Sequence, residues 1–302
     1  MSLLNLTNDG LPNVLVVLYA TVARSKKAMS RDELLEAVAP LRVVHDDGKM
    51  ARQTLNRWIE LGLFVEDNVG IKLDVAPATA LDSEVALLSA TRAAARRCAL
   101  DPRNNPDLWA RQSAKAADLT RSLAWLLAQD VYRTTFQEVE TLESQQVAEF
   151  EVRLMQNNTR RNGLQFWSHF LGFARQPGGG DIDPTVAILE SLDQCLQTRG
   201  DGIPATDFVQ RLGEVLPVLD GGAWRRAIEL RLDAGVLPAM SEGQLSTSLS
   251  RALINLMLDE QLEFTNRADV GSSIIFSGRD GARSDYRYSW VRRLPMRQGG
   301  PR

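Results

Sequence analysis

Basic and amide side chains on one predicted helix are the residues whose types best fit a chemical task. In the stretch MARQTLNRWIELGLFVEDNVGIKL, residues 50–73, Ala51, Leu55 and Trp58 follow at steps of four and three, which predicts one buried helical face. Arginine, glutamine and asparagine pair with guanine and adenine edges in a DNA major groove, and Lys49 at the helix start suits a phosphate contact. The side chains expected opposite the buried face are Arg52, Gln53, Asn56, Arg57 and Glu60.

The residues after this helix predict a small β-hairpin. Gly62 can adopt the left-handed conformation that ends a helix, and residues 63–65 and 71–73 predict two strands joined by the turn EDNVG. Lys72 on the second strand is expected to reach a DNA backbone or minor groove. A helix followed by a two-stranded hairpin is typical of winged-helix domains, which also mediate protein association. The alternative is therefore a solvated helix face that has no ligand or that contacts protein.

A second basic group lies in the last part of the chain, where residues 279–302 hold seven arginines and two aspartates. Tyr286, Tyr288 and Trp290 alternate with some of these arginines; they could stack bases or form the inward face of an ordinary strand. Hydroxyls in the stretch STSLS, residues 246–250 on the preceding predicted helix, could contact phosphates. The expected phosphate contacts are Arg251, Arg279, Arg283, Arg287, Arg292, Arg293 and Arg297, with Ser246, Thr247, Ser248 and Ser250.

No motif in the sequence indicates a reaction. The two histidines, His45 and His169, and the two cysteines, Cys98 and Cys195, lack the spacing of a zinc site. The stretch QPGGGD lacks the Lys-Ser/Thr pair of a phosphate loop, and the acidic pairs fit solvated or capping positions. We therefore expect no enzymatic activity, no metal and no cofactor. Isolated thiols fit a reducing cytoplasm.

The bulk composition excludes two classes of protein. The 302 residues carry a net charge of −3, so the chain is not a generic polyanion binder and any DNA contact depends on local placement of charge. No apolar run approaches the roughly 20 residues that span a bilayer. The apolar stretch near the N-terminus follows Asn5, Asn8 and Asp9 rather than basic residues, which argues against a signal peptide.

The elements around these residues predict a mainly α fold with small β-hairpin wings. The N-terminal part follows the winged-helix order of three helices and a hairpin. The first helix is expected over 11–22, the second begins at a capping box of Ser30 and Glu33, and the third is the helix of residues 50–61, which the hairpin follows. The C-terminal third has the same order, with a recognition-type helix and a hairpin formed by residues 274–276 and 286–291. Two competing registers, Leu55 on Leu249 or Leu55 on Ile254, indicate a repeated architecture rather than a sequence duplication.

Breaks in the pattern divide the chain into three predicted domains. They are an N-terminal winged helix over 1–78, a helical middle domain over 82–176 and a C-terminal winged-helix-like domain with a basic tail over 182–302. In the middle domain, Asp82 is expected to cap the first helix, and residues 136–155 predict a long polar helix with a narrow apolar seam. PGGGDIDP, residues 177–184, marks the second boundary.

Two stretches, SLLNLTNDGLPNVLVVL and LPVLDGGAWRRAIE, resemble the G component of the bacterial Dpd system. That gene cluster inserts 7-deazaguanine derivatives into DNA and restricts unmodified DNA. The resemblance covers residues 3 to about 294 and supplies no active-site residues. It implies a cytoplasmic, non-catalytic accessory protein of a modification and phage-defence system, with double-stranded DNA and other proteins of the system as partners.

An architectural likeness leaves an alternative open. A winged helix at each end with helices between is also the arrangement of kleisin-type subunits of chromosome-organising ATPase complexes, but likeness of fold alone is weak support for a function. The alternative function is a protein–protein scaffold or kleisin-like adaptor without its own DNA contact. The sequence gives no oligomeric state.

Overall fold

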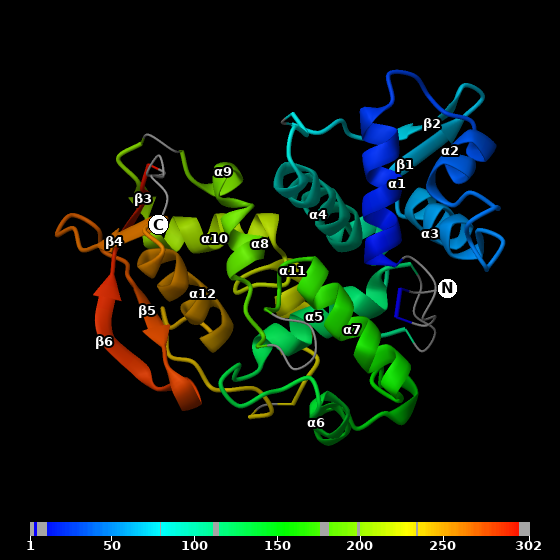
Figure 1. The fold of residues 1–302 in the computed structure, drawn as a ribbon. Coiled ribbons are helices and arrows are strands. Elements are labelled where there is room, and N and C mark those ends of the chain that lie inside the picture. Colours follow the sequence, from blue (N-terminus) through cyan, green and yellow to red (C-terminus); the bar gives the residue numbers. More distant parts are fainter. Residues whose placement is uncertain are drawn as a thin grey trace. The chain divides into compact units, whose positions relative to one another are not determined.

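The computed structural model describes residues 3–4, 11–78, 80–110, 115–175, 181–197, 200–233 and 235–295. Within these residues the fold is mainly helical, with twelve α-helices and a few small antiparallel sheets, as the sequence predicts (Figure 1). The chain forms two compact units, Met1–Thr120 with Leu154–Leu171, and Arg121–Arg153 with Gly172–Arg302. Parts of the predicted middle domain, 82–176, thus contribute to both units. Among the described helices, none combines the length and the apolar character needed to cross a membrane.

The first unit begins with three helices and a hairpin. The elements are α1 (Pro12–Arg24), α2 (Arg31–Val38), α3 (Lys49–Glu60), β1 (Phe64–Asp67) and β2 (Gly70–Leu73). The strands pair antiparallel with Phe64 opposite Leu73, and Met29 forms an additional antiparallel bridge with Ile71. The core of this part is made by the fully buried side chains of Leu15, Leu18, Leu34, Leu55, Trp58 and Phe64.

Local interactions explain where these helices begin. The capping box at α2 is confirmed: Ser30 Oγ accepts from the Glu33 N–H at 3.2 Å, and Glu33 Oε2 accepts from the Ser30 N–H at 2.8 Å. The α3 helix follows Gly48, whose φ of +69° favours glycine. Asp46 then accepts a hydrogen bond from the Met50 N–H at 2.9 Å and satisfies one free amide of the first turn.

Helices α4 (Glu84–Leu100) and α7 (Asn158–Phe170), with the 3₁₀ turn η1 (Pro102–Asn104), complete the first unit. The prediction that Asp82 caps α4 is wrong, because Ser83 Oγ accepts from the Ala86 N–H at 3.1 Å. An N-cap side chain bonds the second or third helical amide, so Ser83 is correctly spaced and Asp82 is one residue too early.

The predicted long helix over 136–155 is also wrong. The structure has a short α6 (Val139–Gln146) followed by a 3₁₀ turn, η2 (Phe150–Val152). Val147 is extended at φ −113°, and its carbonyl accepts from Arg153 Nε at 2.7 Å. A side chain thus takes the carbonyl that a continuing helix would use, and the sparse apolar content offers little packing to oppose the break.

The second unit contains the greater part of α5 (Ala117–Ala128) and a series of short helices. These are α6, α8 (Thr185–Leu189), α9 (Leu192–Cys195), α10 (Ala205–Val215), α11 (Ala223–Glu229) and α12 (Thr247–Leu258). The predicted helix over 186–196 is divided into α8 and α9. Ser191 lies at the break, where its Oγ donates to the Ala187 carbonyl at 2.8 Å, a contact that bends helices.

Two small sheets complete the second unit. One has the order β3 (Ile203–Pro204), β7 (Trp290–Arg293), β4 (Leu262–Thr265), and the other pairs β5 (Ile274–Ser277) with β6 (Arg283–Tyr288). The predicted strand over 286–291 is therefore two strands in different sheets, which separate at Ser289. The Ser289 N–H donates to the Thr265 carbonyl at 3.1 Å, and Ser289 Oγ accepts from the Arg267 N–H at 2.8 Å.

Because the chain changes sheet at Ser289, Tyr286, Tyr288 and Trp290 do not alternate along one strand as the sequence suggests. Tyr288 packs on Phe264 and Phe276, with ring centroids 5.6 and 5.1 Å away. Beyond the break, Val291 is the fully buried side chain, whereas Tyr286 is 71% exposed. Tyr286, Tyr288 and Trp290 therefore do not form one inward face.

The two units share an order of elements. In the first unit, Met29 lies just before α2 and forms a bridge with Ile71 of β2, the last strand of that unit's hairpin. In the second unit, β3 lies just before α10 and pairs with β7, the last described strand of the chain. Helices α3 and α12 have 12 residues each, and residues 61–63 and 259–261 separate them from the next strand. This spacing places Leu55 on Leu253, between the two registers that the sequence suggests.

Candidate nucleic-acid interface

Helix α3 presents a polar outer surface. Lys49, Arg52 and Asn56 are exposed, while Leu55 and Trp58 on the other side are fully buried. Within the described part of the chain, no carboxylate forms an ion pair with Lys49 or Arg52. Two cations and an amide thus lie on the face that the helical period predicts, and we call Lys49, Arg52 and Asn56 the α3 face.

Two other residues predicted for this face lie elsewhere. The prediction that Arg57 lies on the solvent face is wrong, because its side chain is only 4% exposed. Its Nη1 donates to Glu60 Oε2 at 2.7 Å. Arg57 and Thr54 follow Ala51 at steps of three, so they flank the apolar stripe and are covered with it. Gln53 is half-buried, and its Oε1 finds no hydrogen-bond partner in the described chain.

Arg31 is a residue of this region that sequence reasoning did not single out. From the start of α2, its guanidinium binds both carboxylate oxygens of Glu66 at 2.9 and 2.5 Å and donates to Asn56 Oδ1 at 2.5 Å. The hydrogen bond from Arg31 lowers the pKa of Glu66. Only the basic type of Arg31 was visible in the sequence; its reach to α3 and β1 depends on how the helices pack.

Lys72 lies on the hairpin as predicted and is exposed. Its Nζ forms an ion pair with Asp67 Oδ2 at 2.8 Å, across the turn between β1 and β2. The hydrogen bond from Lys72 is the largest cause of the lowered pKa of Asp67. A phosphate at this hairpin would compete with that carboxylate for the lysine.

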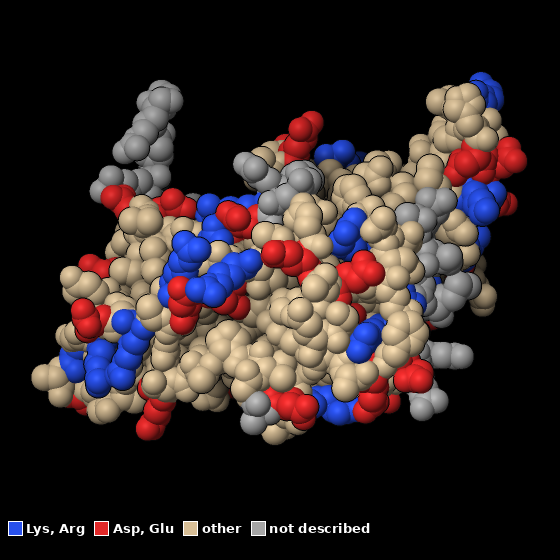
Figure 2. Space-filling model, turned by 90° about the horizontal axis from the view of Figure 1, so that it is seen from below, with Lys and Arg blue, Asp and Glu red and all other residues tan. Residues whose placement is uncertain are grey.

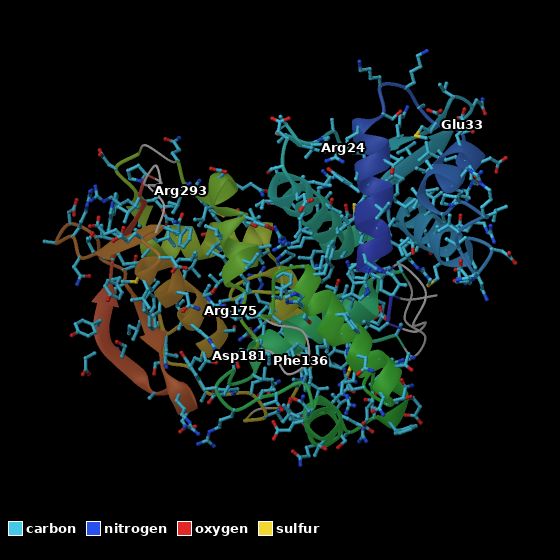
Figure 3. The ribbon with its side chains drawn as sticks, viewed as in Figure 1. Arg24, Glu33, Phe136, Arg175, Asp181 and Arg293 are labelled. Carbon is cyan, nitrogen blue, oxygen red and sulfur yellow. The ribbon has the colours of Figure 1, made fainter. Side chains whose placement is uncertain are left out.

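The arginines of the C-terminal region fall into two groups. Arg279, Arg283 and Arg287 are exposed on η3 (Arg279–Gly281) and β6. Arg292 pairs with Glu263, and Arg293, labelled in Figure 3, pairs with Asp193. Arg297 lies outside the described residues. On the face drawn in Figure 2, basic side chains occur in small groups mixed with acidic ones rather than as a continuous surface.

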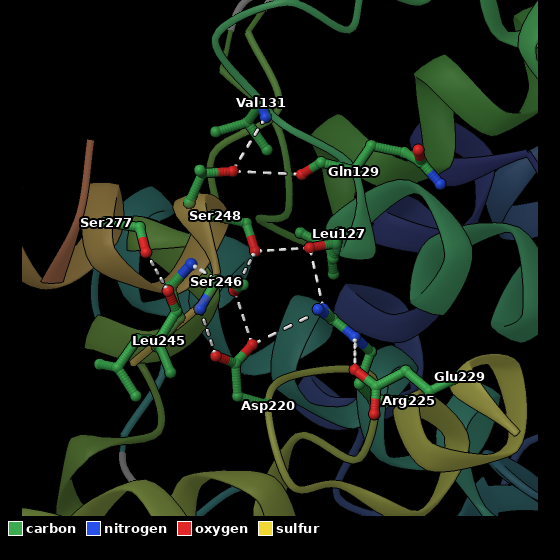
Figure 4. A network of polar contacts seen from close by, with 12 residues as sticks. Leu127, Gln129, Val131, Asp220, Arg225, Glu229, Leu245, Ser246, Ser248 and Ser277 are labelled. Atoms are coloured by element: carbon green, nitrogen blue, oxygen red, sulfur yellow. Dashed lines mark hydrogen bonds and ion pairs between the residues drawn. The ribbon is translucent and has the colours of Figure 1, made fainter. Parts of the chain in front are cut away.

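The predicted phosphate-contacting hydroxyls of α12 are buried, which corrects that expectation (Figure 4). Thr247 Oγ1 donates to the Gln129 carbonyl at 3.1 Å, and Ser248 Oγ donates to the Leu127 carbonyl at 2.7 Å. Ser250 Oγ accepts from the Ser277 N–H at 2.8 Å. The first turn of α12 is therefore attached to the end of α5 and to β5 rather than presented to a ligand.

Arg251 is similarly engaged within the second unit. Its Nη2 binds Asp181 Oδ2 at 2.6 Å, and its guanidinium lies 5.6 Å from the ring centre of Tyr132. Figure 3 shows Asp181 beside Arg175, whose Nε binds the buried carboxylate of Asp183 at 2.8 Å. A phosphate would have to displace Asp181 to reach Arg251.

The stretch LPVLDGGAWRRAIE supplies a buried ion pair to the same region. Arg225 is 2% exposed; its Nη1 lies 3.6 Å from Asp220 Oδ1 and 2.9 Å from the Leu127 carbonyl, and its Nε binds Glu229 at 2.6 Å. Asp220 in turn accepts from the Ser246 hydroxyl at 2.6 Å and the Ser246 N–H at 2.7 Å. Figure 4 shows this network joining α5, α11 and the start of α12.

Neither thiol has the properties of a nucleophile. Burial raises the pKa of Cys195 to about 11 and raises the pKa of Cys98. Both thiols are therefore protonated near neutral pH, whereas the thiolate is the reactive form. His45 and His169 are exposed, on a loop and on α7.

Comparison with known proteins identifies the family. The model of the DpdG-like family matches residues 1–270, which is most of the chain. No curated protein and no solved structure matches. The match includes both stretches that carry the sequence resemblance and confirms it. The chain therefore belongs to the DpdG-like family, which suggests a component of a Dpd system for DNA modification and phage defence.

Proposed function

We propose that this protein is a non-catalytic, DNA-binding accessory component of a Dpd system and that it contacts double-stranded DNA through α3. The observation that carries the proposal is the α3 face, where Lys49, Arg52 and Asn56 are exposed next to a hairpin with Lys72. These residue types supply phosphate contacts from the lysines and base-edge contacts from the arginine and asparagine.

The arrangement of elements supports a winged-helix reading of this region. Three helices precede a two-stranded hairpin, and Met29 adds a bridge to its last strand. In helix-turn-helix proteins the second helix of the motif lies in the major groove while neighbouring elements contact the backbone. We assign the groove-reading role to α3 and the backbone contact to the hairpin.

The second unit has the same order of elements, but we do not assign DNA contact to its α12. The first turn of α12 is buried, and Arg251, Arg292 and Arg293 are held by carboxylates of the same unit. These carboxylates would compete with phosphates for the same arginines. A second winged helix that serves a structural or protein-binding role fits these contacts.

The test is a gel shift with duplex DNA and the full chain at salt concentrations from about 50 to 200 mM. Arg52→Ala and Asn56→Ala are each expected to lower affinity about five- to a hundredfold, because a lost base contact costs about 1–3 kcal/mol. Lys72→Ala should weaken binding to all sequences alike and flatten the salt slope by about one unit.

Arg24→Ala is the matched control. Arg24 is an exposed arginine in the last turn of α1 and is not part of the α3 face (Figure 3). It should leave binding unchanged. Absence of binding at the lowest salt, or equal losses from Arg24→Ala and Arg52→Ala, would contradict DNA recognition by α3.

A scaffold or kleisin-like adaptor is the second candidate function. It is favoured by the net charge of −3 and by the internal pairing of the C-terminal arginines, both of which limit attraction to a polyanion. Co-purification with the products of neighbouring genes, retained after nuclease treatment, supports it. If Arg52→Ala and Asn56→Ala disturb that association and leave DNA affinity unchanged, the scaffold function replaces the DNA-binding one.

A further inference from the structure

The second unit contains an apolar groove that DNA contact by α3 does not use. The groove has a volume of about 510 Å³ and lies between the second half of α12 and the β5–β6 hairpin. Its lining includes Ile254, Met257, Leu258, Phe276, Tyr286 and Tyr288. This volume lies within the range of about 300–1,000 Å³ found for binding pockets.

Two large apolar side chains at this groove are open to solvent. Leu258 is 76% exposed on the last turn of α12, and Tyr286 is 71% exposed on β6. Tyr288 and Phe276, by contrast, are packed together with ring centroids 5.1 Å apart. The groove thus has a packed floor and an open apolar rim, so a ligand that covers the rim would remove apolar area from water.

The charged side chain that lines the groove is basic. Arg283 lines it, and Arg279 lies in the turn that closes the hairpin; both are exposed. Within the described residues, neither arginine forms an ion pair, whereas Asp280 of the same turn is taken by Arg133. Arg287 is exposed on β6 but does not line the groove.

The chemistry of the groove indicates an acidic ligand with aliphatic side chains. Arg279 and Arg283 favour carboxylates, while Leu258 and Met257 favour an apolar group. Residues 294–302, which follow β7, contain Arg297 and Arg302 and no acidic residue, so charge disfavours them as the occupant. A nucleic acid would satisfy the arginines but would leave the aliphatic lining without a matching surface.

We propose that this groove binds an acidic peptide segment of a partner protein, with an aliphatic side chain of the segment inserted beside Leu258 and Met257. Carboxylates of the segment pair with Arg279 and Arg283. The surface provides protein recognition in addition to the DNA contact proposed for α3, and it does not depend on that contact.

The test selects peptides from a random library of about eight residues, enough for an extended segment to cross the hairpin, against the full chain. Enriched peptides are then synthesised and titrated by fluorescence anisotropy. The expected sequences combine Asp or Glu with Leu, Ile or Val. Leu258→Ser and Arg283→Glu should each weaken binding of these peptides about tenfold or more, as expected for residues central to an interface.

The controls match each substitution in chemistry. Leu230→Ser changes a leucine that is 87% exposed and does not line the groove, and Arg42→Glu reverses an exposed charge in the first unit. Both variants should bind the peptides as the unaltered chain does, and circular dichroism should show that all four variants are folded.

Four results would overturn the proposal. One is a selection that enriches no acidic–aliphatic sequence, and another is binding that Leu258→Ser and Arg283→Glu leave unchanged. The third is that a single-stranded oligonucleotide displaces the peptide and binds the Leu258→Ser variant as well as it binds the unaltered chain. That result would assign the surface to nucleic acid. Self-association of the chain that Leu258→Ser abolishes would assign it to a second copy.

Discussion

Single aromatic residues connect distant segments of the first unit. Trp58 of α3 is fully buried, and its ring centre lies 5.5 Å from that of Trp167 on α7. Trp167 in turn meets Phe170 edge to face, with centroids 5.7 Å apart. The opposite face of the same helix carries Arg52, so the position of the α3 face depends on this aromatic contact.

Trp58→Ala is expected to lower the free energy of unfolding by about 3–5 kcal/mol, because it removes a large buried side chain and leaves a cavity. Urea denaturation followed by circular dichroism measures the change. Phe166→Ala is the control, since Phe166 lies on α7 but is 61% exposed; it should change stability by about 0.5 kcal/mol or less. Equal losses from the two variants would contradict a core role for Trp58.

The buried pair of Asp220 and Arg225 gives a second prediction for single residues. Asp220→Ala removes the acceptor of two hydrogen bonds from Ser246 and leaves the guanidinium of Arg225 buried with less compensation. The expected loss of stability is about 3–5 kcal/mol. The matched change Asp193→Ala breaks the pair with Arg293 at a carboxylate that is 77% exposed, and should cost about 1 kcal/mol or less.

Thermal or urea unfolding of both variants distinguishes a buried ion pair from a surface one. The network of Figure 4 predicts that Asp220→Ala also exposes the start of α12, where Ser246 would lose its partner. Faster hydrogen exchange confined to α12 and the end of α5 would support this. A loss of stability no larger than that of Asp193→Ala would show that Arg225 is not held by Asp220.

At the scale of elements, the ends of helices depend on single hydrogen bonds whose positions the sequence specifies only to within one residue. Asp82 and Ser83 are both good N-cap types, and both precede an apolar helix. The side chain of Ser83 reaches the Ala86 N–H, so it is the cap of α4.

Ser83→Ala should therefore lower stability by about 1 kcal/mol, whereas Asp82→Ala should have almost no effect. The two substitutions remove neighbouring polar side chains from the same exposed segment, and each serves as the control for the other. The midpoints of urea unfolding are the measurement. A larger effect at Asp82 than at Ser83 would mean that the helix begins one residue earlier.

At the scale of the whole molecule, the chain forms two units rather than three segments in sequence order. The first unit includes Leu154–Leu171, which follows a segment assigned to the second. Trp167 packs on Trp58, and Asn104 Nδ2 donates to the Leu61 carbonyl at 2.8 Å. Residues well beyond 78 thus complete the core around α3.

A fragment of residues 1–78 is therefore expected to unfold without a cooperative transition, since it lacks Trp167 and Asn104. Near-ultraviolet circular dichroism during urea denaturation tests this against the full chain, where the signal from buried tryptophans should change in a sharp transition. A fragment that unfolds cooperatively at the midpoint of the full chain would show that the predicted 1–78 domain is independent of α4 and α7.

The sequence by itself determined the elements whose signals are local. The 3.6-residue period placed Ala51, Leu55 and Trp58 on the buried side of α3 and Arg52 and Asn56 outside, because the geometry of the helix fixes which side chains share a face. The Ser30–Glu33 capping box was also readable, since both of its hydrogen bonds lie within one turn. The quoted stretches were enough to indicate the family.

Tertiary structure decided what depends on residues far apart in the chain. The α12 hydroxyls bond carbonyls at the end of α5, and the chain changes sheet at Ser289, which bonds Thr265; each contact requires a partner from another segment. Arg292 and Arg293 also form ion pairs with carboxylates far away in the sequence, whereas Arg283 stays exposed. The sequence gives all three the same charge, and only the folded chain distinguishes them. Side-chain type gives charge and size, but exposure and pairing depend on which surfaces meet, and no period in the sequence encodes that meeting.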